Sequence, residues 1–143
     1  MFKNILVLCT GNICRSPIAE ILLRARHVQP GVGVLSAGTS ALVGHPADPL
    51  AVEVAKKFGH DLSKHRAQQA VTPLLKSADL VLVMTREHAD WVHERLPPLR
   101  GRVHLLGRWR QTEVADPYGE GPDAFAAAWA QIDALVGDWL PRL

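Results

Sequence analysis

Four apolar residues near the start of the chain, Ile5-Leu6-Val7-Leu8, lead directly into Cys9. An unbroken apolar run of this kind is typical of a strand that is buried on both faces of a parallel sheet. Shortly afterwards, Ser16-Pro17 has the pattern of a helix start, with a hydroxyl that can cap the first turn and a proline that fits within it. The sequence therefore predicts that Cys9 lies where a strand ends and a tight loop leads into a helix.

The segment from Cys9 to Ser16, which we call the cysteine loop, is suited to holding an oxyanion. A helix start offers unpaired N–H groups and a partial positive charge, and the amides of a tight loop form a concave nest. Arg15 can grip two phosphate oxygens bidentately, and the positive surroundings favour the Cys9 thiolate, which is the nucleophilic form. We therefore expect a phosphate group to be bound by the residues that follow Cys9, namely Thr10, Gly11, Asn12, Ile13, Cys14, Arg15 and Ser16.

Other phosphate and metal motifs fit this chain less well. Neither the Walker pattern nor the dinucleotide fingerprint occurs in it. Cys9 and Cys14 lack the short ligand spacing of zinc motifs, and His88 and His93 are not helical neighbours. We expect no metal site and no cofactor.

Cleavage of a phosphate ester also needs a proton for the leaving oxygen, and Asp116 is the candidate donor. It begins the turn Asp116-Pro117-Tyr118-Gly119, in which the proline fixes the chain after the acid and the glycine allows a bend. Alternatively, Asp116 only accepts a local hydrogen bond in the turn. The presence of the cysteine loop favours the interpretation that Asp116 is the general acid.

Over essentially its whole length, the chain resembles the low molecular weight protein tyrosine phosphatases. Residues Cys9 to Ser16 match the signature loop of that family, and Asp116-Pro117-Tyr118 matches its acid loop. Ser36-Ala37-Gly38, Ala41-Leu42-Val43-Gly44 and Ala47-Asp48-Pro49 are most similar to bacterial enzymes of capsule and exopolysaccharide gene clusters. The resemblance implies one domain over residues 1–143 that hydrolyses phosphotyrosine through a phosphocysteine intermediate.

The resemblance also implies a role for individual residues. Cys9 is expected to be the nucleophile, Arg15 the phosphate clamp and Asp116 the general acid. A hydrogen-bond network that supports the loop is expected to involve Asn12, Ser16, Ser36 and His65.

The slot for the substrate ring departs from the family pattern. The resemblance implies that Tyr118 forms one wall of the slot, and Leu42 occupies a position where many relatives have an aromatic residue. Because Gly119 follows Tyr118 in place of a second aromatic residue or an arginine, we expect a more open slot. The implied physiological substrate is a bacterial tyrosine kinase that controls polysaccharide production.

Three other functions share parts of this pattern. Thioredoxin-type arsenate reductases have the same loop and fold, but they relay a disulfide through two further cysteines, and this chain has only Cys9 and Cys14. Relatives that act on phosphoarginine carry a threonine at the position of Ile13, where an apolar side chain suits an aromatic ester better. A module that only binds phosphate would need neither Asp116 nor a nucleophilic thiol.

Cys14 allows a further hypothesis. It lies on the same tight loop as Cys9, so peroxide could drive the two into a reversible disulfide that protects Cys9 from over-oxidation. A small buried loop residue without a redox role is the alternative.

Length and composition constrain the rest of the molecule. A chain of 143 residues with 48% hydrophobic content can bury a full core as one domain, and its net charge is +2. Lys64 to Arg66 and Arg100 to Arg110 are expected to be solvated faces and not nucleic-acid sites. Without a signal peptide or an apolar run of membrane length, and with functional thiols, we expect a cytoplasmic protein without membrane insertion, acting as a monomer.

Apolar runs and helical patterns alternate along the chain. Strands are predicted at Ile5 to Leu8, Val32 to Leu35, Leu80 to Met84 and Val103 to Leu106. Helices are predicted at Pro17 to His27, Pro49 to Phe58, Glu87 to Arg95 and Asp123 to Leu140, with Trp129 and Trp139 as packing residues. This alternation predicts a three-layer α/β/α fold around a central four-stranded parallel sheet, with its ligand at the carboxyl ends of the strands.

Overall fold

The computed structural model describes residues 1–27 and 29–143, and its centre is a parallel sheet. The four strands are β1 (Asn4–Cys9), β2 (Gly33–Gly38), β3 (Leu80–Val83) and β4 (Val103–Leu105), in the order β2-β1-β3-β4. All three pairings are parallel. The predicted four-stranded sheet is therefore confirmed, although β2 begins one residue later than expected and extends to Gly38, because it pairs with β1 as far as Cys9.

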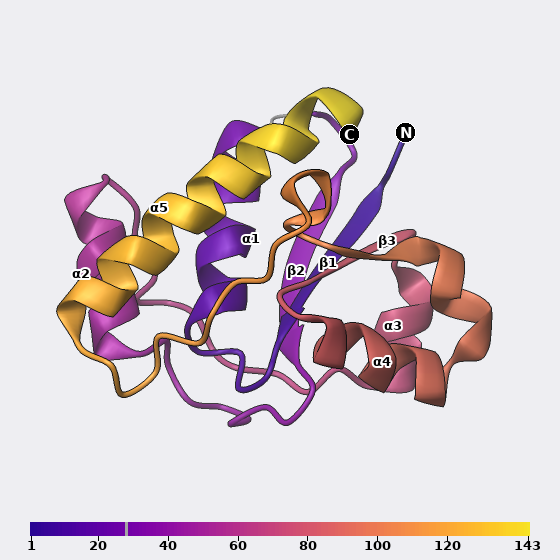
Figure 1. The fold of residues 1–143 in the computed structure, drawn as a ribbon, viewed down its shortest axis with the longest axis horizontal. Helices are drawn as coiled ribbons and strands as arrows, with labels where there is room; N and C mark the ends of the chain where they lie inside the picture. The colour runs from indigo at the N-terminus through magenta and orange to yellow at the C-terminus, as the bar shows by residue number, and fades with distance from the viewer. Residues whose placement is uncertain (28) are drawn as a thin grey trace.

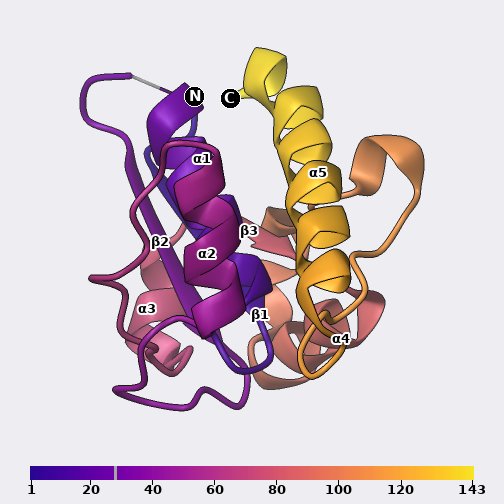
Figure 2. The same cartoon turned by 90° about the vertical axis from the view of Figure 1, so that its left-hand side faces the viewer.

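Within residues 1–27 and 29–143, five α-helices cover the two faces of this sheet. Helices α1 (Arg15–Arg26), α2 (Pro49–Lys57) and α5 (Pro122–Trp139) lie on one face, and α3 (Thr72–Ser77) and α4 (Arg86–Arg95) lie on the other (Figures 1 and 2). Short 3₁₀ segments occupy Pro97–Arg102, Arg108–Arg110 and Leu140–Arg142. The predicted helices α1, α2, α4 and α5 are confirmed to within two residues at each end, whereas α3 was not predicted.

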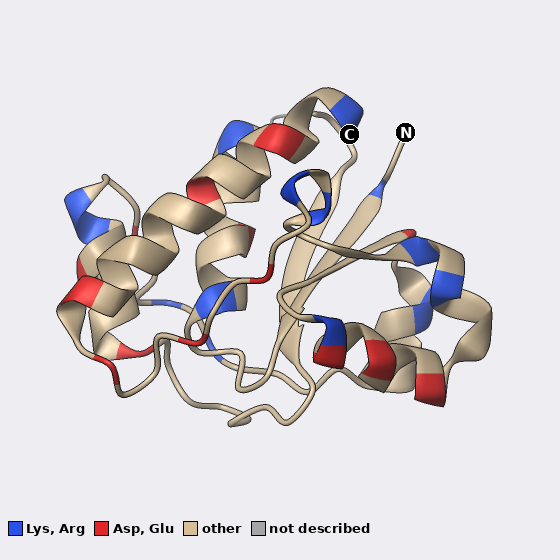
Figure 3. Ribbon diagram, in the orientation of Figure 1, with Lys and Arg blue, Asp and Glu red and all other residues tan. Residues whose placement is uncertain are grey.

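Alternate residues of β1 contribute to two separate cores. Ile5 and Val7 pack with α1, α2 and α5, and Leu6 and Leu8 pack with α3 and α4. No Asp, Glu, Lys or Arg occurs in any of the four strands, and the charged residues lie on helices and loops (Figure 3). Burial on both faces explains why the β1 sequence is continuously apolar.

Trp129 and Trp139 on α5 are 2% and 3% exposed. They pack in the core on the α1 side of the sheet, as the sequence predicted. Among the helices in residues 1–27 and 29–143, none is both long enough and apolar enough to cross a membrane.

The start of α1 differs from the sequence-based expectation. Cys14 is the N-cap residue and no side chain caps this helix, so the prediction that the Ser16 hydroxyl caps it is wrong. Ser16 is the second residue of α1, and its hydroxyl instead contacts Cys9 and Asn12. The helix therefore begins inside the cysteine loop, and the first amides of the helix are part of that loop.

The segment after β2 runs beside the cysteine loop at the carboxyl edge of the sheet. Thr39 N donates to Cys9 O over 2.9 Å, and Leu42 N donates to Gly11 O over 3.1 Å. Gly38 is required here, since a Cβ at this position would lie 2.4 Å from the carbonyl oxygen of Thr10. This close approach places Leu42 next to the cysteine loop.

Candidate active site

The candidate site begins at Cys9, the last residue of β1. Its side chain is buried, and its Sγ lies 2.9 Å from Ser16 Oγ on the first turn of α1. The loop between these two residues therefore folds back on itself, so that the cysteine faces the start of the helix.

Asn12, at the centre of this loop, is fully buried and has a positive φ of 59°. Its Oδ1 accepts a hydrogen bond from the main-chain N–H of Gln68 over 2.9 Å, which identifies the other amide atom as the donor. Asn12 Nδ2 donates to both Ser16 Oγ and Ser36 Oγ, each over 2.9 Å. The Asn12 carbonyl accepts from His65 Nε2 over 2.6 Å. The left-handed backbone of Asn12, which is uncommon for a residue other than glycine, is thus fixed by four hydrogen bonds.

The donors and acceptors in this network set the direction of each hydroxyl. Because Ser16 Oγ already accepts from Asn12, its own hydrogen is free to donate to Cys9 Sγ, which stabilises a thiolate there. Ser36 Oγ likewise accepts from Asn12 and donates to Glu20 Oε1. One amide thus orients two hydroxyls, one of which faces the sulfur.

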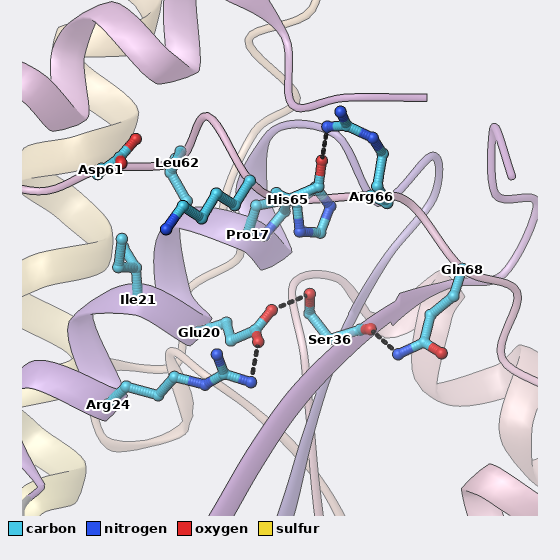
Figure 4. A pocket seen from close by; sticks show the side chains of 11 residues that line it. Pro17, Glu20, Ile21, Arg24, Ser36, Asp61, Leu62, His65, Arg66 and Gln68 are labelled. Atoms are coloured by element: carbon cyan, nitrogen blue, oxygen red, sulfur yellow. Dashed lines mark hydrogen bonds and ion pairs between the residues drawn. The ribbon is translucent and has the colours of Figure 1, made fainter. Parts of the chain in front are cut away.

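Glu20 ends the network on the side away from Cys9. One of its carboxylate oxygens accepts from Ser36, and the other pairs with Arg24 over 2.6 Å (Figure 4). A cavity of about 280 Å³ is lined by these residues together with His65 and Gln68 (Figure 4). The loop is therefore supported from behind by side chains of α1, of β2 and of the segment that follows Leu62.

Arg15 is the first residue of α1 and is 4% exposed. Its Nη1 donates to the carbonyl of Val114 over 3.0 Å. Its Nη2 lies 3.7 Å from Asp116 Oδ2, and its buried Nε has no hydrogen-bond partner among the described residues. Two guanidinium nitrogens, Nε and Nη2, therefore remain for an anion, and they form the fork that matches two oxygens of a phosphate.

Asp116 reaches the site from the loop that precedes α5. Its Oδ1 accepts from the N–H of Tyr118 over 3.1 Å, and its side chain is half exposed. The local turn bond and the approach to Arg15 thus occur together, since each uses a different carboxylate oxygen. The carboxyl group is held beside the guanidinium while it stays accessible to a bound molecule.

These side chains meet at one cavity of about 310 Å³. Ile13, Leu42 and Tyr118 supply apolar walls, and Leu42 and Tyr118 are 42% and 59% exposed. The expected site residues that line it are Cys9, Thr10, Gly11, Ile13, Cys14, Arg15, Leu42, Asp116 and Tyr118. Ser40 lines it as well, although no sequence motif singled this residue out.

Four expected site residues do not line this cavity. The side chains of Asn12, Ser16, Ser36 and His65 lie in the supporting network. Asn12 and Ser16 can therefore reach a bound phosphate only through the main chain.

Cys14 differs from Cys9 in its surroundings. Burial raises the pKa of the Cys14 thiol well above its ordinary range, and the nearby charges of Asp48 and Cys9 act in the same direction. Cys14 is therefore a protonated thiol near neutral pH. Neither cysteine forms a disulfide in this structure.

Sequence reasoning missed His88, a buried residue on α4 that contacts the loop. Its Nδ1 accepts from the N–H of Thr85, and its Nε2 lies 2.9 Å from Thr10 Oγ1. Burial lowers the pKa of His88 to about 4, and the positive charge of Arg15 acts in the same direction. The imidazole is therefore neutral, with its proton on Nε2 and donated to Thr10. The capping-box spacing of Thr85 and His88 was the one sequence signal for this arrangement.

This arrangement can transfer a phosphoryl group. It combines a sulfur that accepts a hydrogen bond, a guanidinium with two free nitrogens and a carboxyl group, all facing a slot with apolar walls. The described residues contain no group of three His, Cys, Asp or Glu side chains placed to hold a metal ion.

Comparison with known proteins gives one consistent result. The sequence model of the family described as low molecular weight phosphotyrosine protein phosphatase matches residues 4–143. The probable low molecular weight protein-tyrosine-phosphatase EpsP of Ralstonia nicotianae is 48% identical, over 100% of this chain and 97% of that protein.

Solved structures agree with the sequence match. The crystal structure of the Erwinia amylovora tyrosine phosphatase AmsI has a TM-score of 0.94 and 42% identity, and the match covers 100% of this chain and 94% of that one. Vibrio vulnificus Wzb in complex with benzylphosphonate has a TM-score of 0.94 and 38% identity, with all of both chains covered.

Proposed function

The chain belongs to the low molecular weight phosphotyrosine protein phosphatases, and we propose that Cys9 is the nucleophile with which it hydrolyses phosphotyrosine. The observation that carries this proposal is the meeting of three groups at one cavity. Cys9 and Arg15 lie on one short loop, Asp116 comes from a distant segment of the chain, and all three line the slot whose walls include Leu42 and Tyr118.

In the first step, the Cys9 thiolate attacks phosphorus in line with the ester oxygen. A sulfur–phosphorus bond forms, the phosphorus–oxygen bond to the ring breaks, and the Asp116 carboxyl group gives its proton to the departing oxygen. The products are phosphocysteine, a free phenol and the Asp116 carboxylate. The 3.7 Å separation between Asp116 and Arg15 supports this role, because it places the acid next to the phosphate clamp.

In the second step, a water molecule attacks the phosphocysteine. The Asp116 carboxylate takes a proton from the water, the sulfur–phosphorus bond breaks, and inorganic phosphate and the Cys9 thiolate are released. The Ser16 hydroxyl, 2.9 Å from Cys9 Sγ, stabilises the thiolate as the leaving group of this step. The active site then returns to its starting state.

Charge in both transition states is stabilised by Arg15 and by the loop amides. Nη1 of Arg15 is occupied by the carbonyl of Val114, so Nε and Nη2 face the equatorial oxygens. A clamp that is fixed before the substrate arrives costs no reorganisation during the reaction. Asn12 and His65 serve this function by holding the loop in its strained shape.

The substrate class follows from the walls of the slot. Ile13, Leu42 and Tyr118 supply apolar surface around the position of the ester, which supports an aromatic leaving group. We propose that the physiological substrate is a phosphorylated bacterial tyrosine kinase that controls polysaccharide production. The similarity to enzymes of the capsule and exopolysaccharide type supports this proposal, and two free thiols fit a reducing compartment such as the cytoplasm.

A side-by-side assay tests the proposal. Proteins phosphorylated on tyrosine, serine and arginine are compared as substrates with a chelator present, and Cys9→Ser is the control. We expect rapid release of phosphate from phosphotyrosine alone and none with the variant. Preference for phosphoarginine would overturn the proposed substrate class, and turnover by Cys9→Ser would overturn the proposed nucleophile.

A further inference from the structure

The first turn of α4 contacts both of the loops that carry the proposed chemistry. His88 on this turn reaches Thr10, the residue after the nucleophile. The main-chain N–H of Arg86, at the start of the same turn, donates to the carboxylate of Glu113 over 2.6 Å, on the segment that leads to Asp116. One helical turn therefore lies between the cysteine loop and the acid loop.

The contact to the cysteine loop is fixed in direction and in distance. His88 is 5% exposed, and because its Nδ1 accepts from Thr85, its Nε2 donates to Thr10 Oγ1 over 2.9 Å. Thr10 is held on its other side as well, since its carbonyl accepts from Ser40 N over 3.0 Å. The position of Thr10 relative to α4 is therefore set by a part-buried hydrogen bond from a neutral imidazole.

The contact to the acid loop has a different character. Glu113 is exposed, and its carboxylate binds an N–H at the start of a helix, where a negative charge is also favoured by the helix dipole. The adjacent Val114 is bound through its N–H to Met84 O over 3.0 Å and through its carbonyl to Arg15. Only Val114 and Ala115 separate Glu113 from Asp116, which lines the cavity.

Acidic residues lie on the first turn of α4 and along the loop before α5 (Figure 3). Among them, Glu113 binds the helix, while Glu87 lies exposed on the same turn of α4. Glu87 therefore offers a matched comparison for the loss of one negative charge near the site.

We propose that the first turn of α4 sets the distance between nucleophile and general acid, with His88 positioning the cysteine loop through Thr10 and Glu113 positioning the acid loop. Neither His88 nor Glu113 lines the cavity that Cys9, Arg15 and Asp116 share, so both are positioning residues. The proposal rests on the proposed function, in which Cys9 is the nucleophile and Asp116 is the acid.

Two aryl phosphate substrates distinguish an effect on the acid loop from an effect on the cysteine loop. Phenolate, whose conjugate acid has a pKa of about 10, needs a proton in order to leave, whereas 2,4-dinitrophenolate leaves without one. We measure kcat/KM for both substrates, because this quantity reports the first chemical step. Thermal unfolding confirms that each variant is folded at the assay temperature.

For Glu113→Ala we expect kcat/KM for phenyl phosphate to fall by roughly 10-fold, because a small displacement of the general acid slows the proton transfer. For dinitrophenyl phosphate, kcat/KM should stay within about twofold of the wild-type value. Glu113→Gln keeps an oxygen that can accept from Arg86 N–H, so it should retain most of the activity. Glu87→Gln removes a charge from the same turn and should match the wild type with both substrates.

For Thr10→Val we expect a different pattern. Loss of the hydroxyl frees the cysteine loop, which both substrates use, so both values of kcat/KM should fall by the same factor, again roughly 10-fold. Inhibition by inorganic phosphate should weaken in parallel. Thr10→Ser keeps a hydroxyl that can accept from His88, so both values of kcat/KM should fall less than in Thr10→Val.

Asp116→Ala, measured on the same two substrates, distinguishes failure of this inference from failure of the proposed function. If Asp116→Ala does not lower phenyl phosphate turnover selectively, the acid itself is misassigned. If Asp116→Ala is selective, the inference is overturned by a Glu113→Ala variant that affects both substrates equally or neither. It is also overturned by wild-type kinetics in Thr10→Val.

Discussion

The Nδ2 atom of Asn12 donates a hydrogen bond to Ser16 Oγ over 2.9 Å, and it is this contact that frees the serine hydrogen for the sulfur of Cys9. The same amide group also donates to Ser36. A single side chain therefore connects the shape of the loop to the charge state that the nucleophile needs.

Replacement of Asn12 separates these two effects. Asn12→Ala removes the network and places an alanine at a positive φ, which costs about 1–2 kcal/mol of backbone energy. Asn12→Gly removes the same hydrogen bonds but accepts the positive φ without strain. We expect both variants to lose at least about 10-fold in kcat/KM, with Asn12→Ala the less stable of the two in urea unfolding.

The glycine variant is the decisive one. If Asn12→Gly hydrolysed aryl phosphates at the wild-type rate, the side-chain network would have no role in catalysis, and only the backbone conformation would matter.

Removal of either proposed reacting group should affect turnover directly. Cys9→Ser should abolish hydrolysis, because a serine hydroxyl is not ionised near neutral pH. Asp116→Ala should lower it by roughly 10²–10⁴-fold, the usual range for general acid catalysis. Steady-state assays with para-nitrophenyl phosphate and phenyl phosphate measure both effects, and near-normal rates in either variant would refute the role given to that residue.

A matched acid on the same loop serves as the control for Asp116. Glu120 is exposed and is absent from the residues that line the cavity. Glu120→Gln should therefore keep wild-type activity, and a comparable loss in this variant would point to the charge of the loop as a whole and away from a specific proton donor.

The neutral state of His88 should make stability depend on pH. Burial lowers the pKa of His88 from 6.5 to about 4, so the unfolded chain binds a proton between these values that the folded protein does not. Stability should therefore fall as the pH drops from about 6.5 to about 4, by up to roughly 3 kcal/mol from this group alone. Above pH 6.5 the imidazole is neutral in both states, and the contribution vanishes.

Urea unfolding of wild type and His88→Gln over this range isolates the effect. Glutamine does not titrate, and it fits the capping box with Thr85, so the variant should fold. The difference in free energy of unfolding between the two proteins should shift in favour of the variant at acid pH. Parallel curves from pH 7 to pH 4.5 would contradict a neutral buried His88.

The architecture could be predicted because each strand is marked locally. Four apolar runs alternate with helical patterns, and β1 is uniformly apolar because it is buried on both sides. Helix α3 was missed because its six residues are too few to show a helical period. Cys9 and Arg15 could be identified because they lie close together in sequence and because the loop that joins them has a recognisable spacing.

The supporting contacts depend on pairs that are far apart in sequence. Ser16 looks like a helix cap in the sequence, and only its position beside Asn12 and Cys9 shows what its hydroxyl contacts. His88 lies 78 residues from Thr10, and a histidine that caps a surface helix has the same local pattern as one that reaches the site. Such contacts are set by the tertiary fold, which brings α4 to the same edge of the sheet as the cysteine loop.

The pair of cysteines should respond to peroxide in a defined way. Peroxide oxidises the Cys9 thiolate to a sulfenic acid and is itself reduced to hydroxide, and attack by the Cys14 thiolate on that sulfur forms a disulfide and releases a second hydroxide. Both residues line the same cavity, and the charge of Cys9 contributes to the raised pKa of the Cys14 thiol. Wild-type enzyme inactivated by peroxide should therefore recover with dithiothreitol, whereas Cys14→Ala should be lost progressively to sulfinic acid.

The protonation state of Cys14 sets the pH dependence of this protection. Burial, followed by the charges of Asp48 and Cys9, raises the pKa of the Cys14 thiol, so the thiolate needed for disulfide formation is scarce near neutral pH. The recoverable fraction should therefore increase from neutral to alkaline pH in the wild type and stay low in Cys14→Ala. Mass spectrometry of the two proteins after timed exposure to peroxide measures both fractions. Equal recovery at every pH would show that Cys14 is a packing residue of the loop without a protective role.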